Sequence, residues 1–346
     1  MYFPTAGIEC SPLLPPLAAF AISLFTSLGG VSGAFLLLPF QMSFLGYVNP
    51  SVSATNQFFN VVATPSGVWR YAREGRLVAP LALAVAAGTL PGVFIGAIIR
   101  VRWLPDPAAF TVFAAAVLLF IGGRMARDLW RGKRPAPPPL YLPTRTAGGL
   151  PAWSLSRPSS AHAAKDARTW TERLRAALRG LTVRAGTQSS PRTAAFPRVR
   201  MLSCTLRQVS YEYNGETCSF PIAGVLMLTF IVGIVGGTYG IGGGAIIAPF
   251  LVSLFGLPVH TVAGASLLGT FLTSVAAVAF YMLIAPWFPE VSIAPDFLLG
   301  LLLGLGGMAG IYCGARLQKH VPARAIKLLL TAVLLFTAAR YLWKAL

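Results

Sequence analysis

Two long stretches of this sequence contain no charged side chain. No Asp, Glu, Lys, Arg or His occurs from residue 10 to residue 69, and no Asp, Glu, Lys or Arg occurs from Thr217 to Pro289. A helix needs about 20 apolar residues to cross a bilayer, and several apolar runs of the chain approach that length. Only 11% of the residues are charged, whereas soluble domains average about 25%. The sequence therefore predicts an all-α polytopic membrane protein.

The basic residues gather in one block between two apolar halves. Residues 124–207 contain seventeen Lys or Arg against three acidic residues and hold most of the net charge of +18. Cytoplasmic loops of membrane proteins are rich in Lys and Arg, so the block predicts a cytoplasmic loop rather than a nucleic-acid-binding surface. A surface for anionic lipid or for a partner is the alternative.

We expect three parts along the chain: a first transmembrane repeat over 10–124, a basic and largely flexible cytoplasmic insert over 125–218, and a second transmembrane repeat over 219–346. Within the insert, residues 165–181 form an amphipathic pattern, which is typical of a helix on the membrane surface; disorder or simple packing is the alternative. Asn214-Gly215 is a hairpin turn signal.

Internal matches indicate that the two halves are repeats. AVLLF occurs at 116–120 and at 332–336, and Pro39-Phe40 recurs as Pro249-Phe250, 210 positions later. Each half reads as five apolar segments, which gives 8–10 spans. The second segment of each half is short, and a tilted span, a half-helix and a re-entrant piece all remain open for it. The distribution of basic residues among the short loops favours inverted repeats.

The glycine-rich stretch GGTYGIGGGAIIAP, at 236–249, predicts a helix break inside an apolar segment, and a shorter version occurs at 29–33. We expect the continuing helices to begin near Gly243–Ala245 and near Gly33–Ala34. A helix that restarts there exposes free amides and the positive end of its dipole, which attract anions. Glycine lets the backbone adopt positive φ and approach a ligand.

Polar side chains follow on the third segment of each half. Asn56, Asn60 and Thr64 share one helical face, as do Ser266, Thr270 and Thr273; Gln57 and Ser274 lie on the same segments. We expect the two sets to line the path and to donate hydrogen bonds to an oxyanion, with interhelical packing as the alternative. Since no cationic side chain lies in these stretches, dipoles and hydroxyls would hold the anion.

The candidate substrate-binding residues are therefore the glycines of both breaks and the polar residues that follow them. They are Gly29, Gly30, Gly33, Asn56, Asn60, Gly236, Gly237, Gly240, Gly242, Gly243, Gly244, Ser266, Thr270 and Thr273. Arg70, Arg73 and Arg316 are expected to attract anions at the inner mouth of the path.

Signals for catalysis are missing from the sequence. The four cysteines form no CxxC pair and have no metal-ligand spacing, and no GxxxxGK[ST] phosphate loop occurs. The apolar segments hold no acid pair or Ser–His pair. We expect no enzyme activity, no cofactor and no metal.

The stretch GGTYGIGGGAIIAPFLVSLFGLPVHTVAGASLLGTF resembles the signature of the TauE/SafE sulfite exporter family: a Gly-rich loop, a proline a few residues later, then a helix of small residues. The first half resembles the same pattern with three loop residues fewer, so the resemblance covers about 10–124 and 220–343. The insert over 125–218 is a departure from the compact members of this family.

The resemblance implies a multi-pass permease of the inner membrane that moves sulfite, a sulfonate or a related organic anion, most simply by export. The partners expected are this small anion and the lipid bilayer, with anionic lipid at the insert and no nucleic acid. An importer of an organosulfur or carboxylate anion, and a membrane scaffold that acts through the insert, are the alternatives.

Overall fold

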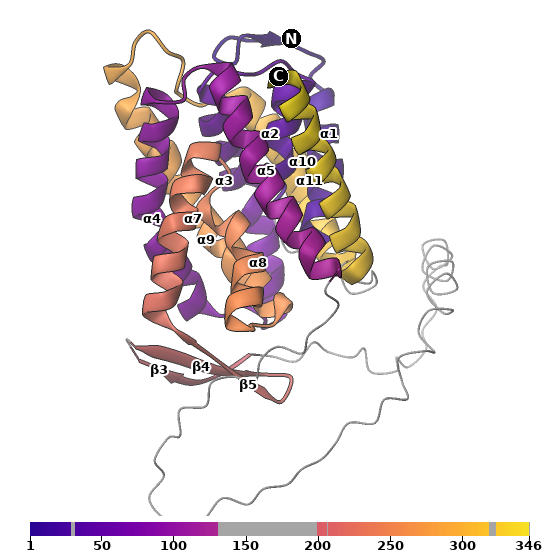
Figure 1. Ribbon diagram of the computed structural model, residues 1–346, viewed down its shortest axis with the longest axis vertical. Coiled ribbons are helices and arrows are strands. Elements are labelled where there is room, and N and C mark those ends of the chain that lie inside the picture. Colours follow the sequence, from indigo (N-terminus) through magenta and orange to yellow (C-terminus); the bar gives the residue numbers. More distant parts are fainter. Residues whose placement is uncertain (29–31, 131–198, 206, 318–322, 346) are drawn as a thin grey trace, which may run out of the picture. The chain divides into compact units, whose positions relative to one another are not determined.

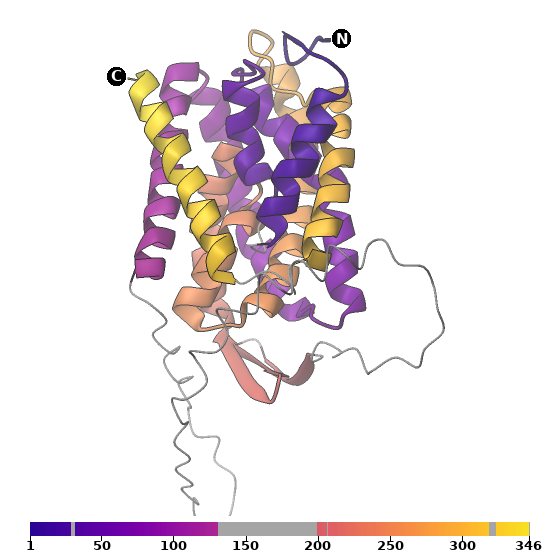
Figure 2. The ribbon, with the colours of Figure 1, turned by 90° about the vertical axis from the view of Figure 1, so that its right-hand side faces the viewer.

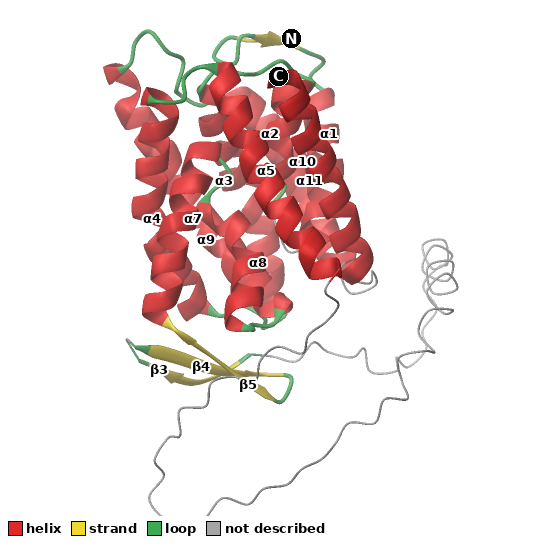
Figure 3. Cartoon of the chain, in the orientation of Figure 1, coloured by secondary structure: helices red, strands yellow, loops and turns green. Residues whose placement is uncertain are grey.

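A computed structural model describes residues 1–28, 32–130, 199–205, 207–317 and 323–345 of the chain. These residues form a helical bundle with a small antiparallel sheet at one end (Figures 1 and 3). The first half contains the strands β1 (Tyr2–Phe3) and β2 (Ile8–Glu9) and the helices α1 (Leu14–Leu28), α2 (Ala34–Ser43), α3 (Ser51–Arg73), α4 (Ala79–Arg102) and α5 (Pro107–Trp130). The second half contains the strands β3 (Arg200–Cys204), β4 (Gln208–Tyr213) and β5 (Glu216–Pro221), the helices α7 (Ile222–Tyr239), α8 (Gly243–Phe255) and α9 (Val259–Ile284), the short helix η1 (Ala285–Trp287), and the helices α10 (Phe297–Leu317) and α11 (Ala323–Ala345). The predicted helix at 165–181 lies outside the described residues.

The two ends of the bundle differ. Strands β3, β4 and β5 lie at one end, called the sheet end here, whereas the β1–β2 hairpin and the end of α11 lie at the other, called the terminus end (Figures 1 and 2). Helix α3 begins at the terminus end, where the Ser51 amide donates to the Ser292 carbonyl at 2.9 Å. It finishes at the sheet end, where the Val199 amide donates to the Gly75 carbonyl at 2.8 Å.

Helices α1 and α2 make one re-entrant hairpin, and α7 and α8 make another. Phe255, at the end of α8, lies beside Gly224 near the start of α7, so this pair enters and leaves at the sheet end. The first pair enters and leaves at the terminus end, since Asn49 Nδ2 donates to the Thr5 carbonyl at 3.4 Å. The short second segment of each half therefore turns back toward the end at which its hairpin starts, so it is not a tilted span, and both a half-helix and a re-entrant piece fit this course.

Five described helices are long and apolar enough to cross a membrane, judged by length and composition: Ala79–Arg102, Pro107–Arg127, Ile222–Tyr239, Val259–Trp287 and Phe297–Leu317. Helix α3 has 23 residues but is rich in polar side chains, most of which are buried. The polar side chains of α3 pack against other helices and so do not face lipid, which is why a polar helix can lie inside an apolar bundle.

Helices α3 and α9 cross each other in opposite directions near their midpoints. Gln57 of α3 contacts Ser274 of α9, and Gly67, ten residues later, lies beside Leu267, seven residues earlier. Each residue from Ser51 to Arg73 has the same degree of burial as the residue 210 positions later. This offset equals the one between Pro39 and Pro249, so the packing supports two repeats of opposite direction.

The predicted hairpin at Asn214-Gly215 is confirmed. Both residues have positive φ, 56° and 79°, as a tight two-residue turn requires, and β4 pairs with β5 on either side of it. Strand β4 alternates between buried and half-buried residues, and its Tyr211 hydroxyl bonds to the Thr261 hydroxyl at 2.9 Å. Burial raises the pKa of the Tyr211 phenol, which keeps this bond neutral.

Replacing Gly215 by Ala should loosen the hairpin without any clash. No heavy atom lies within 4 Å of a Cβ at this position, so the cost is the left-handed backbone alone, about 1–2 kcal/mol. Hydrogen exchange of the segment 208–221 should speed up about tenfold. Gly123→Ala, at a helical glycine with equally open space, should leave this segment unchanged; equal exchange in the two variants would contradict the turn assignment.

Candidate functional site

The break between α7 and α8 is built from glycines. Gly240 has φ of +86° and closes α7, and the amides of Gly240 and Ile241 both donate to the Gly236 carbonyl, at 2.9 and 3.0 Å. Gly242 has φ of +71°, and α8 begins at Gly243, where the sequence predicted a restart. Gly242 has no side chain with which to cap this start, and no side chain of the described residues is seen to do so. The first amides of α8 are thus available to an anion.

The break between α1 and α2 is described only in part, since Gly29 and Gly30 lie outside the described residues. Gly33 immediately precedes α2, which begins at Ala34, again at the predicted place. The Ser32 hydroxyl accepts a hydrogen bond from the Ala34 amide at 3.3 Å. This helix start is therefore partly satisfied by its own chain.

Asn60 joins the two breaks. Its Oδ1 accepts a hydrogen bond from Ser32 Oγ at 2.5 Å, and its Nδ2 donates to the Ile241 carbonyl at 3.0 Å. The side chain is fully buried near the middle of α3. Because Ser32 precedes α2 and Ile241 precedes α8, one amide group fixes the relative position of both helix starts.

Asn56 lies one turn earlier on α3 and contacts α2. Its Nδ2 donates to the Ala34 carbonyl at 3.0 Å, and its Oδ1 accepts from Gln41 Nε2 at 3.4 Å. Both polar ends of Asn56 are therefore engaged by α2, which makes it a support for the first break.

The hydroxyls of two candidate threonines on α9 bond to their own helix in this structure. Thr270 donates to the Ser266 carbonyl at 2.9 Å, and Thr273 donates to the Gly269 carbonyl at 2.8 Å. Threonines in helices commonly bond the preceding turn in this way. Both threonines thus donate their hydroxyl protons to carbonyls of their own helix. Ser266 Oγ, in contrast, is buried and has no hydrogen-bond partner among the described residues.

Sequence reasoning left Gln57 and Ser274 out of the candidate set. Ser274 Oγ donates to Gln57 Oε1 at 2.7 Å across the α3–α9 crossing. A Cβ on Gly242 would lie 2.9 Å from Ser274 Oγ and 3.4 Å from Gln57 Oε1. Gln57 Nε2 is buried and has no hydrogen-bond partner within the described part of the chain. Two unused N–H donors therefore lie beside the uncapped start of α8.

The glycines of the second break are closely packed. A Cβ on Gly243 would overlap Thr89 of α4, and one on Gly244 would overlap the Ser266 carbonyl. Gly236 and Gly237 lie in the last turn of α7, before the break, and Gly237 packs against Val93 of α4. Gly240, Gly242, Gly243 and Gly244 thus form the break itself.

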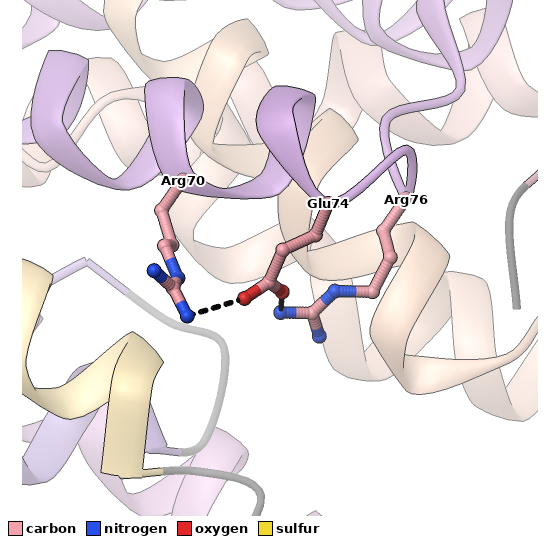
Figure 4. Close-up of polar contacts among 3 residues, drawn as sticks. All are labelled: Arg70, Glu74 and Arg76. Atoms are coloured by element: carbon pink, nitrogen blue, oxygen red, sulfur yellow. Dashed lines mark hydrogen bonds and ion pairs between the residues drawn. The ribbon is translucent and has the colours of Figure 1, made fainter. Parts of the chain in front are cut away.

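The basic residues at the sheet end are partly neutralised. Glu74 forms ion pairs with Arg70, at 2.7 Å, and with the buried Arg76 (Figure 4). Arg76 also stacks on Tyr71, with 4.5 Å from its guanidinium carbon to the ring centre. Arg73 is exposed and lies over Trp69. Of these three arginines, Arg73 is the one that is exposed and does not pair with Glu74.

Arg100 corrects the expectation that cationic side chains are missing near the breaks. Helix α4 continues to Arg102, and Arg100, in its last turn, is fully buried. Its Nε donates to Ser53 Oγ at 3.3 Å. A Cβ on Gly240 would lie 2.5 Å from Ser53 Cα, so the arginine is separated from the second break by a single residue. The burial of Arg100 could not be predicted from the distribution of charged residues along the sequence.

Among the described residues, no group of three or more His, Cys, Asp or Glu side chains is placed to hold a metal ion. Around the second break, the described polar groups are amides, hydroxyls and the guanidinium of Arg100.

Comparison with known proteins agrees with this architecture. The family model "Sulfite exporter TauE/SafE" matches residues 16–341. "Probable membrane transporter protein YdhB" of Bacillus subtilis is 31% identical over 115 residues, which cover 33% of this chain and 43% of that protein. "Probable membrane transporter protein YunE" of the same organism is 25% identical over 128 residues, 37% of this chain and 44% of that protein.

These alignments span less than half the length of the two relatives. No solved structure matches the chain. The family model, in contrast, covers both hairpins, both crossing helices and nearly the whole chain. The chain is therefore a polytopic, mainly helical membrane protein that belongs to the TauE/SafE sulfite exporter family.

Proposed function

We propose that this protein is a permease of the inner membrane that exports a small anion, namely sulfite, a sulfonate or a related organic anion. The observation that carries the proposal is the unused Nε2 of Gln57, whose side-chain amide group lies beside Gly242 at the uncapped start of α8. Buried polar groups in proteins are nearly always hydrogen-bonded, so unused donors beside a helix N-terminus favour an anionic ligand.

The substrate would sit between the two hairpins, where α3 and α9 cross. Asn60 would hold the two helix starts in register, and the amides of Gly242–Gly244 would face the anion. Because Gly243 and Gly244 are closely packed in the described arrangement, passage requires α8 to separate from α4 and α9. A re-entrant hairpin contacts its neighbours over short helices, which makes such a movement less costly than moving a full span.

The sheet end would face the cytoplasm. Arg70, Arg73 and Arg76 lie at or just after the end of α3 at the sheet end, and cytoplasmic loops carry an excess of Lys and Arg. A negative-inside potential then favours anion export by about 2.3 kcal/mol per charge per 100 mV. Export therefore needs no carboxylate proton relay.

Sulfite flux from proteoliposomes at a set potential tests the proposal. Gln57→Leu should lower the flux at least tenfold, since it removes both N–H donors and leaves Ser274 without its acceptor. Leucine fits the helix, because Leu267 occupies the equivalent position 210 residues later.

Gln208→Leu is the matched control, on β4 and away from the break, and it should transport normally. Full flux in Gln57→Leu, with a wild type that transports, would contradict a site at this break. No flux of sulfite or of small sulfonates in the wild type would contradict the permease itself.

Two alternatives give different results. An importer of an organosulfur or carboxylate anion would carry that anion inward at the same site. A scaffold that acts through the basic insert would lose partner binding when residues 140–195 are deleted, whereas a permease should keep its flux.

A further inference from the structure

Arg100 is a buried positive charge whose observed partners are all neutral. Its exposed fraction is 0%, and its guanidinium donates to Ser53 Oγ, to the Leu104 carbonyl and, at 3.4 Å, to the Val48 carbonyl. No acidic side chain of the described residues forms an ion pair with it. Burying a charge is costly unless an opposite charge compensates it, and ionisable residues within membrane segments commonly mark a ligand path.

The surroundings of Arg100 reduce this cost without cancelling the charge. Its guanidinium carbon lies 3.7 Å from the ring centre of Phe110, a cation–π contact. The Leu104 and Val48 carbonyls are partial negative charges, and Arg100 itself lies near the C-terminal, negative end of the α4 dipole. The buried Asp296 lies at the same end of the bundle, but its carboxylate oxygens accept hydrogen bonds from the amides of Ala6 and Leu299, and it forms no ion pair with Arg100.

Arg100 lies on the continuation of the proposed substrate site. Ser53 precedes Gln57 by one turn on α3 and also donates to the Thr238 carbonyl at 3.4 Å. On α9, Tyr281 follows Ser274 by two turns, and its hydroxyl donates to the Gly237 carbonyl at 3.5 Å. A line of polar groups therefore leads from Gln57 and Ser274 toward the terminus end and reaches Arg100.

The other end of the bundle provides a contrast. Tyr71 is the residue of α3 that corresponds to Tyr281, and a buried arginine, Arg76, stacks on it. Glu74 pairs with Arg76, so that charge is compensated by the protein. The two ends thus carry comparable buried arginines, of which only the one at the sheet end has a carboxylate.

We propose that Arg100 and Ser53 form a second anion-binding station on the path, between the break at Gly240–Gly242 and the terminus end, that takes a small oxyanion with at least one full negative charge. This inference rests on the proposed function. The bonds from Arg100 to Ser53 and Val48 are long, at 3.3 and 3.4 Å, and an oxyanion would replace them with shorter, charge-assisted bonds to the guanidinium fork. At this station the positive charge of Arg100 would offset the negative charge of an exported anion inside the protein, before the anion leaves at the terminus end.

The test compares three variants in proteoliposomes. Arg100→Gln should raise the KM for sulfite at least tenfold, and Arg100→Lys about two- to fivefold, because an ammonium keeps the charge but loses the fork. Arg102→Gln is the matched control: it removes the same charge two residues away, where the side chain is exposed, and should leave KM unchanged.

A second measurement separates binding from a purely structural role. Sulfate, which is divalent, and methanesulfonate, which is monovalent, are compared as competitors of sulfite flux. Loss of the Arg100 charge should weaken sulfate more than methanesulfonate, whereas loose packing would weaken both equally. Thermal unfolding of each variant is recorded alongside.

An unchanged sulfite KM in Arg100→Lys and Arg100→Gln, or an equal loss for both competitors, would overturn the station. If the glutamine variant does not fold, the lysine variant decides by the same two measurements. If the wild type carries no flux, the permease fails, and equilibrium binding of sulfite to the protein in nanodiscs still tests the station: equal binding by wild type and Arg100→Gln would refute it.

Discussion

Replacing Asn60 by Asp should reduce sulfite flux about a hundredfold. The variant keeps the acceptor for Ser32 Oγ but turns the donor that faces the Ile241 carbonyl into a carboxylate oxygen. It also places a negative charge beside the two helix starts that would attract the substrate. Two like charges about 6 Å apart repel by about 3 kcal/mol at an effective dielectric constant of about 20. The measurement is sulfite flux from proteoliposomes at fixed potential, normalised to folded protein.

Asn49→Asp is the control for this substitution. Asn49 lies at the terminus end and donates to the carbonyls of Thr5 and Ala6, at 3.4 Å each, so it makes the same chemical change away from both breaks. Flux should fall by less than threefold. A folded Asn60→Asp protein with normal flux would show that the anion does not pass near the helix starts.

The positions of the helix breaks could be predicted from local chemistry. Glycine is the residue that adopts positive φ without strain, and Gly240 and Gly242 do so at the predicted break. Helices α2 and α8 begin where the sequence placed their starts. The course of the chain after each break could not be predicted, because hydrophobicity alone does not distinguish a tilted span from a hairpin that turns back.

The hydrogen bonds of the polar side chains could not be predicted, because their partners lie far away in the sequence. Asn60 lay on the predicted face, yet its role follows from Ile241, 181 residues later. Gln57 follows Asn56 by one residue, so it points about 100° away, onto α9. Only the crossing of α3 and α9 gives it Ser274 as a partner, and no periodicity within α3 contains that information.

Arg100 shows that a charged residue at the end of an apolar segment need not be exposed to water. Basic residues at the end of an apolar segment usually lie in water, and Arg102 does so. Arg100 is buried because α4 continues past it and because Phe110, at the start of the next helix, covers its guanidinium. That placement depends on the return of α5, which is a tertiary feature.

Replacing Gly237 by Val should unfold the protein or lower its stability by about 3 kcal/mol or more. A Cβ on Gly237 would lie 2.5 Å from the Val93 carbonyl oxygen and 2.7 Å from Val93 Cα. Forcing extra atoms into a packed contact costs about 1–3 kcal/mol, and here the obstacle is backbone, which cannot rotate away. Helices α4 and α7 would have to separate. Thermal unfolding of the purified protein in detergent measures the effect.

Gly123→Val provides the matched control, since no heavy atom lies within 4 Å of a Cβ at this helical glycine. It should unfold at nearly the wild-type temperature. Close approach of glycine-bearing helices is a common basis of membrane helix packing, and Gly92 and Gly96 of α4 meet α7 in the same contact. Equal stability of the two variants would mean that α4 and α7 do not pack this closely at Gly237.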